Sequence, residues 1–90
     1  MKSKSKVVAY ILLNISTGRE LDVLKYAKKL NGVTEARLVY GEYDGIVRVE
    51  VDEIKELDKV VLRLRAHDGV LRTVTLLSSE VNEYKMSEEA

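Results

Sequence analysis

The sequence predicts an α+β domain in which a strand–helix–strand unit occurs twice. Runs rich in aliphatic and β-branched residues alternate with segments whose apolar residues have helical spacing. The halves also have a similar tripeptide after each predicted helix, Asn31-Gly32-Val33 in the first and Asp68-Gly69-Val70 in the second. A short turn with two glycines joins the halves. We therefore expect a four-stranded antiparallel sheet with both helices on one face.

The first half begins with a strand at Val7–Ile15, where β-branched and aliphatic residues dominate. Thr17-Gly18-Arg19-Glu20 has the pattern of a capping box, so Thr17 is expected to cap the first helix. The apolar residues with helical spacing are Leu21, Val23, Leu24, Ala27 and Leu30. Gly32 ends the helix, because glycine tolerates the left-handed conformation after a C-cap. A second strand is expected at Val33–Tyr40. One face of this strand would consist of Val33, Glu35, Arg37 and Val39, and the other face of Thr34, Ala36, Leu38 and Tyr40.

The second half repeats this plan from Ile46–Val51, a strand with three valines on one face. Asp52 is the expected N-cap of the second helix. The apolar stripe of that helix is Ile54, Leu57, Val60, Val61 and Leu64. A last strand starts at Val70. Right-handed crossovers and a short central turn make the ferredoxin-like βαββαβ arrangement the simplest solution.

The sequence also predicts that the protein dimerises through its sheet. Two helices cover one face of a sheet, so the other face of each strand should be polar. In the first strand, however, Val8, Tyr10 and Leu12 are apolar on the face opposite the core. The last strand is apolar on both faces, and we assign Leu71 and Leu77 to the uncovered one. A second copy packed against this face would bury it, so a homodimer is expected.

Composition narrows the functional classes. The 90 residues make one domain, with 46% hydrophobic and 33% charged residues and a formal net charge of zero. Zero net charge does not suggest a general affinity for nucleic acid or membrane, and the absence of cysteine excludes disulfides and thiolate sites. No apolar stretch approaches the ~18 residues of a membrane span, and no secretion signal is evident. We expect a cytoplasmic protein without a cofactor, with a basic tail at 1–6, the domain at 7–80 and an acidic tail at 81–90.

The turn at Val39–Gly45 is the most specialised stretch of the chain. Gly41 and Gly45 would let the backbone approach a small zwitterion closely, although a hairpin also favours glycine. Tyr43 would pack on the aliphatic part of a ligand or fill a subunit interface. Asp44 would pair with an ammonium group or hydrogen-bond within its own turn. In the last strand, Thr73 and Thr75 would offer hydroxyls to a carboxylate, or are ordinary strand residues.

In order along the chain, these features resemble the effector-binding (RAM) domain of Lrp/AsnC-type transcription regulators. The resemblance rests on Asn31-Gly32-Val33, Gly41-Glu42-Tyr43-Asp44, the Ile46–Val51 strand and Asp68–Thr75, and it spans Val7–Glu80. It implies the βαββαβ fold, homodimers that assemble into octamers or ten-chain rings, and an amino-acid effector between dimers. The effector-binding residues it implies are Gly41, Tyr43, Asp44, Thr73 and Thr75. Where family members carry a helix-turn-helix domain, this chain has Met1–Lys6. A stand-alone effector domain that contacts no nucleic acid directly, and that has full-length Lrp/AsnC regulators as partners, is therefore expected.

Three classes of function remain open. The first is an amino-acid-sensing regulatory domain, and the second is a structural co-assembly partner of full-length regulators with no effector of its own. The third is a small enzyme on the same fold, which is disfavoured because the chain has one histidine, His67, and no phosphate-cradling glycine loop. We expect no enzyme activity, no catalytic residues and no metal site. RNA binding is also disfavoured, since the strand at Ile46–Val51 has no aromatic residue to stack on bases.

Overall fold

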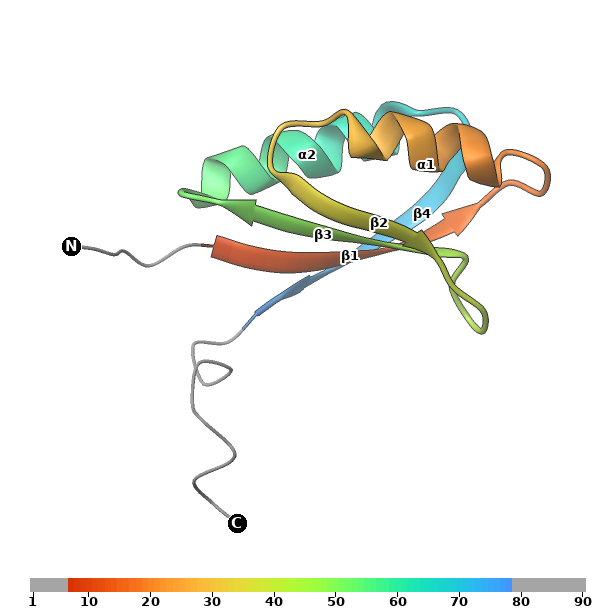
Figure 1. Cartoon of the computed structure of the whole chain (residues 1–90), viewed down its shortest axis with the longest axis horizontal. Coiled ribbons are helices and arrows are strands. Elements are labelled where there is room, and N and C mark those ends of the chain that lie inside the picture. The colour runs from red at the N-terminus through yellow and green to blue at the C-terminus, as the bar shows by residue number, and fades with distance from the viewer. Residues whose placement is uncertain (1–6, 79–90) are drawn as a thin grey trace, which may run out of the picture.

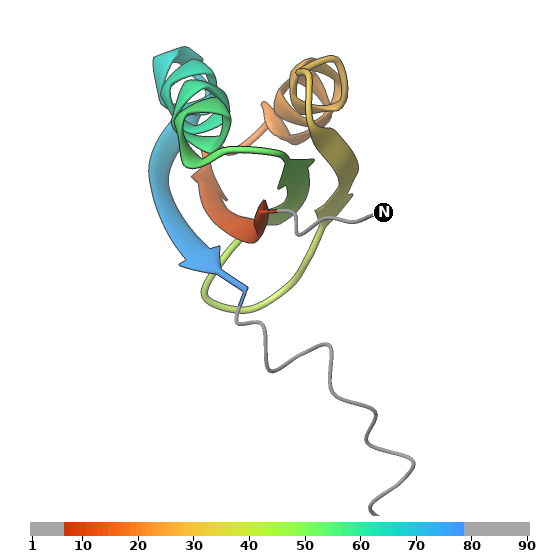
Figure 2. The same ribbon diagram turned by 90° about the vertical axis from the view of Figure 1, so that its left-hand side faces the viewer.

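The computed structural model describes residues 7–78. Its elements are β1 (Val7–Ile15), α1 (Glu20–Lys28), β2 (Val33–Leu38), β3 (Gly45–Val51), α2 (Ile54–Ala66) and β4 (Val70–Leu77). The four strands form one antiparallel sheet in the order β2-β3-β1-β4. Both helices lie on the same face of this sheet, and the other face is uncovered (Figures 1 and 2). The predicted ferredoxin-like βαββαβ fold is thus confirmed, including the pairing of β2 with β3.

The core lies between the helices and the two central strands. Ala9, Ile11, Leu13 and Ile15 of β1 point to the helices, and each is at most 5% exposed. From β3, two valines join them. The helices supply Val23, Ala27, Leu57, Val60 and Leu64. The alternation of side chains along the strands and the 3.6-residue period of the helices therefore bring all these residues into one buried layer.

Both predicted helix caps are wrong by one or two residues. The N-cap of α1 is Arg19, whose side chain makes no capping bond, and Glu20 accepts the backbone N–H of Gly18 instead (3.0 Å). In α2 the N-cap is Glu53 rather than Asp52, and it forms a reciprocal capping box with Glu56. In α2 a glutamate is the N-cap instead of the shorter aspartate that precedes it, so residue type alone did not identify the cap.

The second strand is shorter than predicted and its faces are shifted. It ends at Leu38, and its pairing with β3 is irregular between Val33 and Glu35. Val33 is opposite Val49 and Ala36 is opposite Val47, so both point to the helices. A bulge adds one residue to one strand and reverses the alternation beyond it. The simple two-face assignment therefore fails here.

The uncovered face of β4 also differs from the prediction. Tyr10 of β1 is opposite Leu76 of β4, and Leu12 is opposite Val74. The register of this pairing shifts between Asn14 and Ile15. The β4 residues on the uncovered face are therefore Val74 and Leu76, not the predicted Leu71 and Leu77. We call the apolar side chains of this face the open-face patch: Val8, Tyr10, Leu12, Ile46, Val74 and Leu76. β4 is apolar on both sides, so only its pairing register determines which side is covered.

Other predictions concern the ends of the chain. The tails predicted at 1–6 and 81–90 lie outside the described residues.

Neither helix within residues 7–78 is long and apolar enough to cross a membrane.

Candidate functional site at the glycine turn

The turn between β2 and β3 projects from the sheet on the side away from the helices (Figures 1 and 2). The Val39 N–H donates to the Asp44 carbonyl (3.0 Å) and closes the turn. At its tip Gly41 has a φ of 124°, a conformation that L side chains rarely adopt, and open space surrounds it. The predicted requirement for glycine at position 41 is therefore a backbone requirement.

Three hydrogen bonds fix this turn to the end of β1. The Asp44 N–H donates to the Leu13 carbonyl (2.8 Å). The Ile15 N–H donates to Oδ2 of Asp44 (2.8 Å), and Nδ2 of Asn14 donates to the Glu42 carbonyl (2.8 Å). The side chain of Asp44 thus binds the neighbouring strand rather than its own turn. Because consecutive residues of a central strand hold the turn, its position is coupled to the sheet.

The turn also offers unused hydrogen-bonding groups. The backbone N–H groups of Gly41, Glu42 and Tyr43 have no acceptor within residues 7–78. The second carboxylate oxygen of Asp44, Oδ1, likewise has no partner in that part of the chain. Consecutive free amides attract an anionic group, and a carboxylate oxygen attracts an ammonium group. The two kinds of group lie within four residues of one another, which suits a small zwitterion.

Three of the predicted site residues lie together in the turn, and the two threonines of β4 lie elsewhere. Gly41, Tyr43 and Asp44 are together in the turn, with Tyr43 and Asp44 half-buried. Gly45 is buried at the start of β3, where an added Cβ would lie 3.2 Å from Cδ1 of Ile15. Close packing therefore explains Gly45 without a ligand.

Thr73 and Thr75 are not brought to the turn within one chain. They are opposite Leu13 and Ile11 of β1, so they face the helices at the edge of the sheet. The turn projects to the other side, and two strand spacings, about 10 Å, separate β4 from β3. A ligand that contacted both the turn and these threonines would need them from different chains.

Asn14 is a residue of this site that sequence reasoning missed. It lies in the apolar run Leu12–Ile15, where a carboxamide is unexpected. That anomaly was the available signal, since a polar side chain within a strand usually has a specific partner. Its partner, the Glu42 carbonyl, is 28 residues away and could not be identified from the strand alone.

Charged residues occupy the β2–β3 half of the uncovered face. Nη1 of Arg48 donates to Oγ1 of Thr34 (2.8 Å) and pairs with Glu50 (3.2 Å). A hydrogen bond with Tyr10, and then the bond to Glu50, raise the pKa of Arg48 above its usual value. Beside them Glu35 pairs with Arg37. The charged side chains of this face therefore lie on β2 and β3, which we call the charged half, and five of the six residues of the open-face patch lie on β1 and β4.

His67 has a structural role. It is the C-cap of α2, and its Nδ1 accepts the Gly69 N–H (2.9 Å) while its ring packs edge-on against Tyr26. Residues 7–78 contain no group of three or more histidine, cysteine or carboxylate side chains that could hold a metal.

Comparisons with known proteins extend these observations. Residues 8–89 match the sequence model of the Lrp/AsnC ligand binding domain. The chain is 36% identical over 58 residues to an uncharacterised HTH-type transcriptional regulator from Pyrococcus furiosus, a match that covers 63% of this chain and 39% of the regulator. It is also 38% identical over 48 residues to homocitrate synthase from Saccharolobus solfataricus, which covers 53% of this chain and 10% of the enzyme. The chain therefore spans only a small part of these curated relatives.

Solved structures share the fold. The crystal structure of FFRP-DM1 is 36% identical with a TM-score of 0.76, and the match covers 81% of this chain and 99% of that one. A transcriptional regulator from Neisseria meningitidis in complex with L-Met has a TM-score of 0.74 at 18% identity, with 93% of this chain and 59% of that one covered. At that identity the likeness to the second structure concerns the fold alone.

Proposed function

Since this chain belongs to the Lrp/AsnC ligand binding domain family, we propose that it is a regulatory domain that senses an amino acid at its glycine turn. The observation that carries the proposal is the set of free amides in a turn that three hydrogen bonds attach to β1. A regulator of the same fold was crystallised with L-Met, which supports an amino acid as the effector.

In this proposal each part of the turn contacts a different part of the effector. The free N–H groups of Gly41, Glu42 and Tyr43 donate to the α-carboxylate, and Oδ1 of Asp44 accepts from the ammonium group. The ring of Tyr43 packs on the side chain. Thr73 and Thr75 contribute only if a neighbouring chain brings its β4 to the turn.

We further propose that the uncovered face forms a homodimer interface. Burying one large apolar side chain contributes roughly 1.5–3 kcal/mol, and the open-face patch contains six apolar side chains, of which Leu76 is 51% exposed in the single chain. The charged half would lie at the rim, where Arg48 keeps its partners within the chain. A second copy fits this face, because the open-face patch of one chain can pack on the same patch of another. The ion pairs of the charged half meanwhile stay within their own chain.

The turn itself would lie where dimers meet. Tyr40 is fully exposed and Leu38 is 43% exposed beside the turn, and Leu71 is 67% exposed at the same end of the sheet. Exposed apolar side chains at one end of a small domain mark a second interaction surface. We propose that dimers assemble through it into octamers or ten-chain rings, with the effector held between them.

A panel of the twenty amino acids at millimolar concentration tests the effector. Binding raises the melting temperature, and a ligand at a hundred times its Kd stabilises by about 2.7 kcal/mol. Light scattering with and without the active amino acid tests its effect on assembly. If no amino acid changes the melting temperature while the protein still oligomerises, the structural co-assembly role replaces the sensor.

Two classes of regulated partner follow from the relatives. Full-length Lrp/AsnC regulators are one, because they share the domain and would present the same interfaces. The match to homocitrate synthase favours a metabolic enzyme as the second, since a related segment occurs within that enzyme chain. Pull-down of a helix-turn-helix relative, compared with pull-down of the enzyme, discriminates between them.

A further inference from the structure

A hollow of about 490 Å³ lies at the start of β4, beside the last turn of α2. We call it the β4 hollow, and it is lined by Arg65, Val70, Leu71, Arg72 and Thr73. Both arginines are exposed, and neither side chain makes an ion pair or hydrogen bond within residues 7–78. Asp68, the carboxylate between them in the sequence, pairs with Arg19 instead (2.9 Å). The β4 hollow therefore has two positive charges that nothing in the described part of the chain neutralises.

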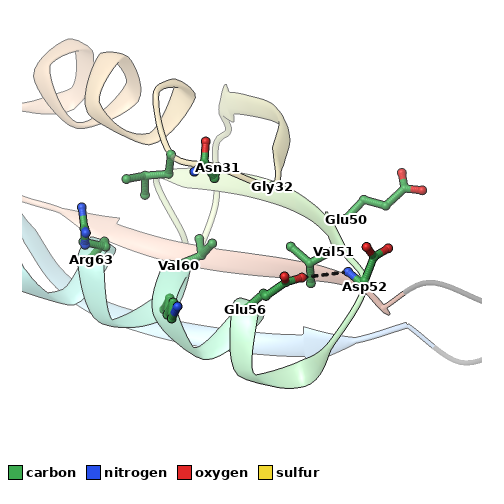
Figure 3. Close-up of a pocket in the computed structure, with 10 residues that line it drawn as sticks. Asn31, Gly32, Glu50, Val51, Asp52, Glu56, Val60 and Arg63 are labelled. Carbon is green, nitrogen blue, oxygen red and sulfur yellow. Dashed lines mark hydrogen bonds between the residues drawn. The ribbon is translucent and has the colours of Figure 1, made fainter.

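The cleft between α2 and the end of β3 has no such excess of charge (Figure 3). Carboxylates and basic side chains line it together: Glu50, Asp52, Glu56, Lys59 and Arg63. Because both signs of charge occur side by side there, that cleft selects neither an anionic nor a cationic partner. The β4 hollow differs from it in having charge of one sign only.

The glycine turn has the opposite charge. Residues 39–45 contain Glu42 and Asp44 but no lysine or arginine. Glu42 is exposed and its side chain makes no bond within residues 7–78, where Oδ1 of Asp44 is free as well. Each surface also has an exposed apolar side chain, which is Tyr40 beside the turn and Leu71 in the β4 hollow. Two free carboxylates thus match two free guanidinium groups, and an apolar contact is available next to them.

The two surfaces lie at the same end of the domain (Figure 1). Arg72 is opposite Asn14 in the sheet, and Nδ2 of Asn14 donates to the Glu42 carbonyl (2.8 Å). Two chains that meet at this end around a two-fold axis would therefore make the contact between turn and hollow twice, once in each direction. A zwitterionic effector adds no net charge, so this contact stays electrically balanced with the effector in place.

We propose that the glycine turn of one chain docks against the β4 hollow of a chain in a neighbouring dimer. In this contact Glu42 pairs with Arg72 of the neighbouring chain, and the exposed apolar side chains pack on each other. Arg65 and Thr73 of the neighbouring chain then face the carboxylate of the effector, together with the free amides of the turn. This inference rests on the proposed effector site and names the residues that a second chain contributes to it.

Reversed charges test this contact, because removing one member of an exposed ion pair changes little. Sedimentation velocity of the wild-type chain should show species larger than the dimer. Glu42→Arg and Arg72→Glu should each remain dimeric, since the open-face patch is intact. Like charges that meet across an interface disfavour it, so dimers of either variant should associate only at a concentration at least tenfold higher than wild-type dimers.

An equimolar mixture of the two variants should assemble as the wild type does. In a mixed contact the new arginine at position 42 meets the new glutamate at position 72, and the unchanged Glu42 meets the unchanged Arg72. Rescue by mixing requires that the pair form between chains. A pair within one chain would be restored only in the double variant, and that result would overturn the proposal.

A matched variant separates this contact from general electrostatics. Lys59→Glu makes the same change of charge as Arg72→Glu at an exposed residue outside both surfaces, and it should assemble as the wild type does. An equal loss of assembly in these two variants would overturn the proposal. So would a wild-type chain that stays dimeric both without and with each of the twenty amino acids.

The panel of twenty amino acids keeps this inference distinct from the proposed effector. If no amino acid shifts the melting temperature while the mixture of variants still assembles, the sensor fails and the contact stands. If an amino acid stabilises the wild type but the mixture stays dimeric, the sensor stands and the contact fails. Arg72→Glu, whose turn is unchanged, should show a smaller ligand-induced shift than the wild type, and an equal shift would mean that the neighbouring chain adds nothing to the site.

Discussion

Asp44 is expected to stabilise the fold as well as to contact the effector. In Asp44→Ala the Ile15 N–H loses its carboxylate acceptor, which is 2.8 Å away and half-buried. Hydrogen bonds to charged groups contribute about 1.5–3 kcal/mol, so the free energy of unfolding should fall by about that amount. In a domain of this size 1 kcal/mol shifts the melting temperature by about 4–8 °C.

Asp44→Asn provides the intermediate case. The amide oxygen can still accept the Ile15 N–H but carries no charge, and a neutral hydrogen bond contributes about 0.5–1.5 kcal/mol. This variant should therefore remain folded, with less destabilisation than Asp44→Ala. Its affinity for the active amino acid should fall, because the ammonium group loses its counter-charge.

Urea denaturation at pH 7 measures these differences, with every variant at one protein concentration because association adds to apparent stability. Glu42→Ala is the matched control. Its side chain makes no bond within residues 7–78, so the change should stay within about ±0.5 kcal/mol. If Asp44→Ala were as stable as Glu42→Ala, the claim that Asp44 attaches the turn to β1 would be wrong.

Further perturbations test other parts of the molecule. Gly32→Ala should destabilise by about 1–3 kcal/mol in urea denaturation, because φ is 95° there and the new Cβ would lie 2.5 Å from a valine side chain of β3; unchanged stability would contradict this packing. Leu12→Asp places a charge in the open-face patch and should convert the proposed dimer to monomers in light scattering at micromolar concentration, whereas Leu62→Asp on the exposed side of α2 should not. The hydrogen bond from Arg19 lowers the pKa of Asp22 below its usual value of 3.8. A lowered folded-state pKa gives stability that is present above the unfolded value and is lost as the pH falls through the folded one. Thermal melts should therefore show a small loss below about pH 4 that Arg19→Gln reduces.

The secondary structure could be predicted because local signals agreed with one another. β1 was predicted at its observed bounds, since eight of its nine residues are apolar and a turn follows them. Gly32 has the predicted positive φ of 95°, but the first helix ends earlier than predicted, at Lys28 with Lys29 as its C-cap. Where two signals competed, as with Asp52 and Glu53 at the start of α2, sequence alone chose the wrong residue.

What the sequence could not predict depends on pairing between distant segments. The bulge next to Val33 and the register of β4 decide which side chains face the helices, and neither has a local signature. The same limit applies to function. The composition of the turn indicated Gly41, Tyr43 and Asp44, but the contribution of Asn14 depends on a contact 28 residues away.

β1 physically links the proposed effector site to the proposed dimer interface. Leu13, Asn14 and Ile15 bind the turn, while Tyr10 and Leu12 of the same strand belong to the open-face patch. If assembly orders this strand, it also orders the turn, and the effector should bind the assembled form more tightly. Linkage then requires that the effector favour assembly by the same factor.

This coupling can be measured with one variant. The Kd of the active amino acid is determined for the wild-type assembly and for monomeric Leu12→Asp, whose turn residues are unchanged. We expect the monomer to bind at least fivefold more weakly, the lower end of typical coupling, which is about 1–3 kcal/mol. The concentration at which wild-type chains associate should shift by a matching factor when the amino acid is added. Equal affinity in both forms would mean that each chain binds its effector alone, and the site would then not depend on neighbouring copies.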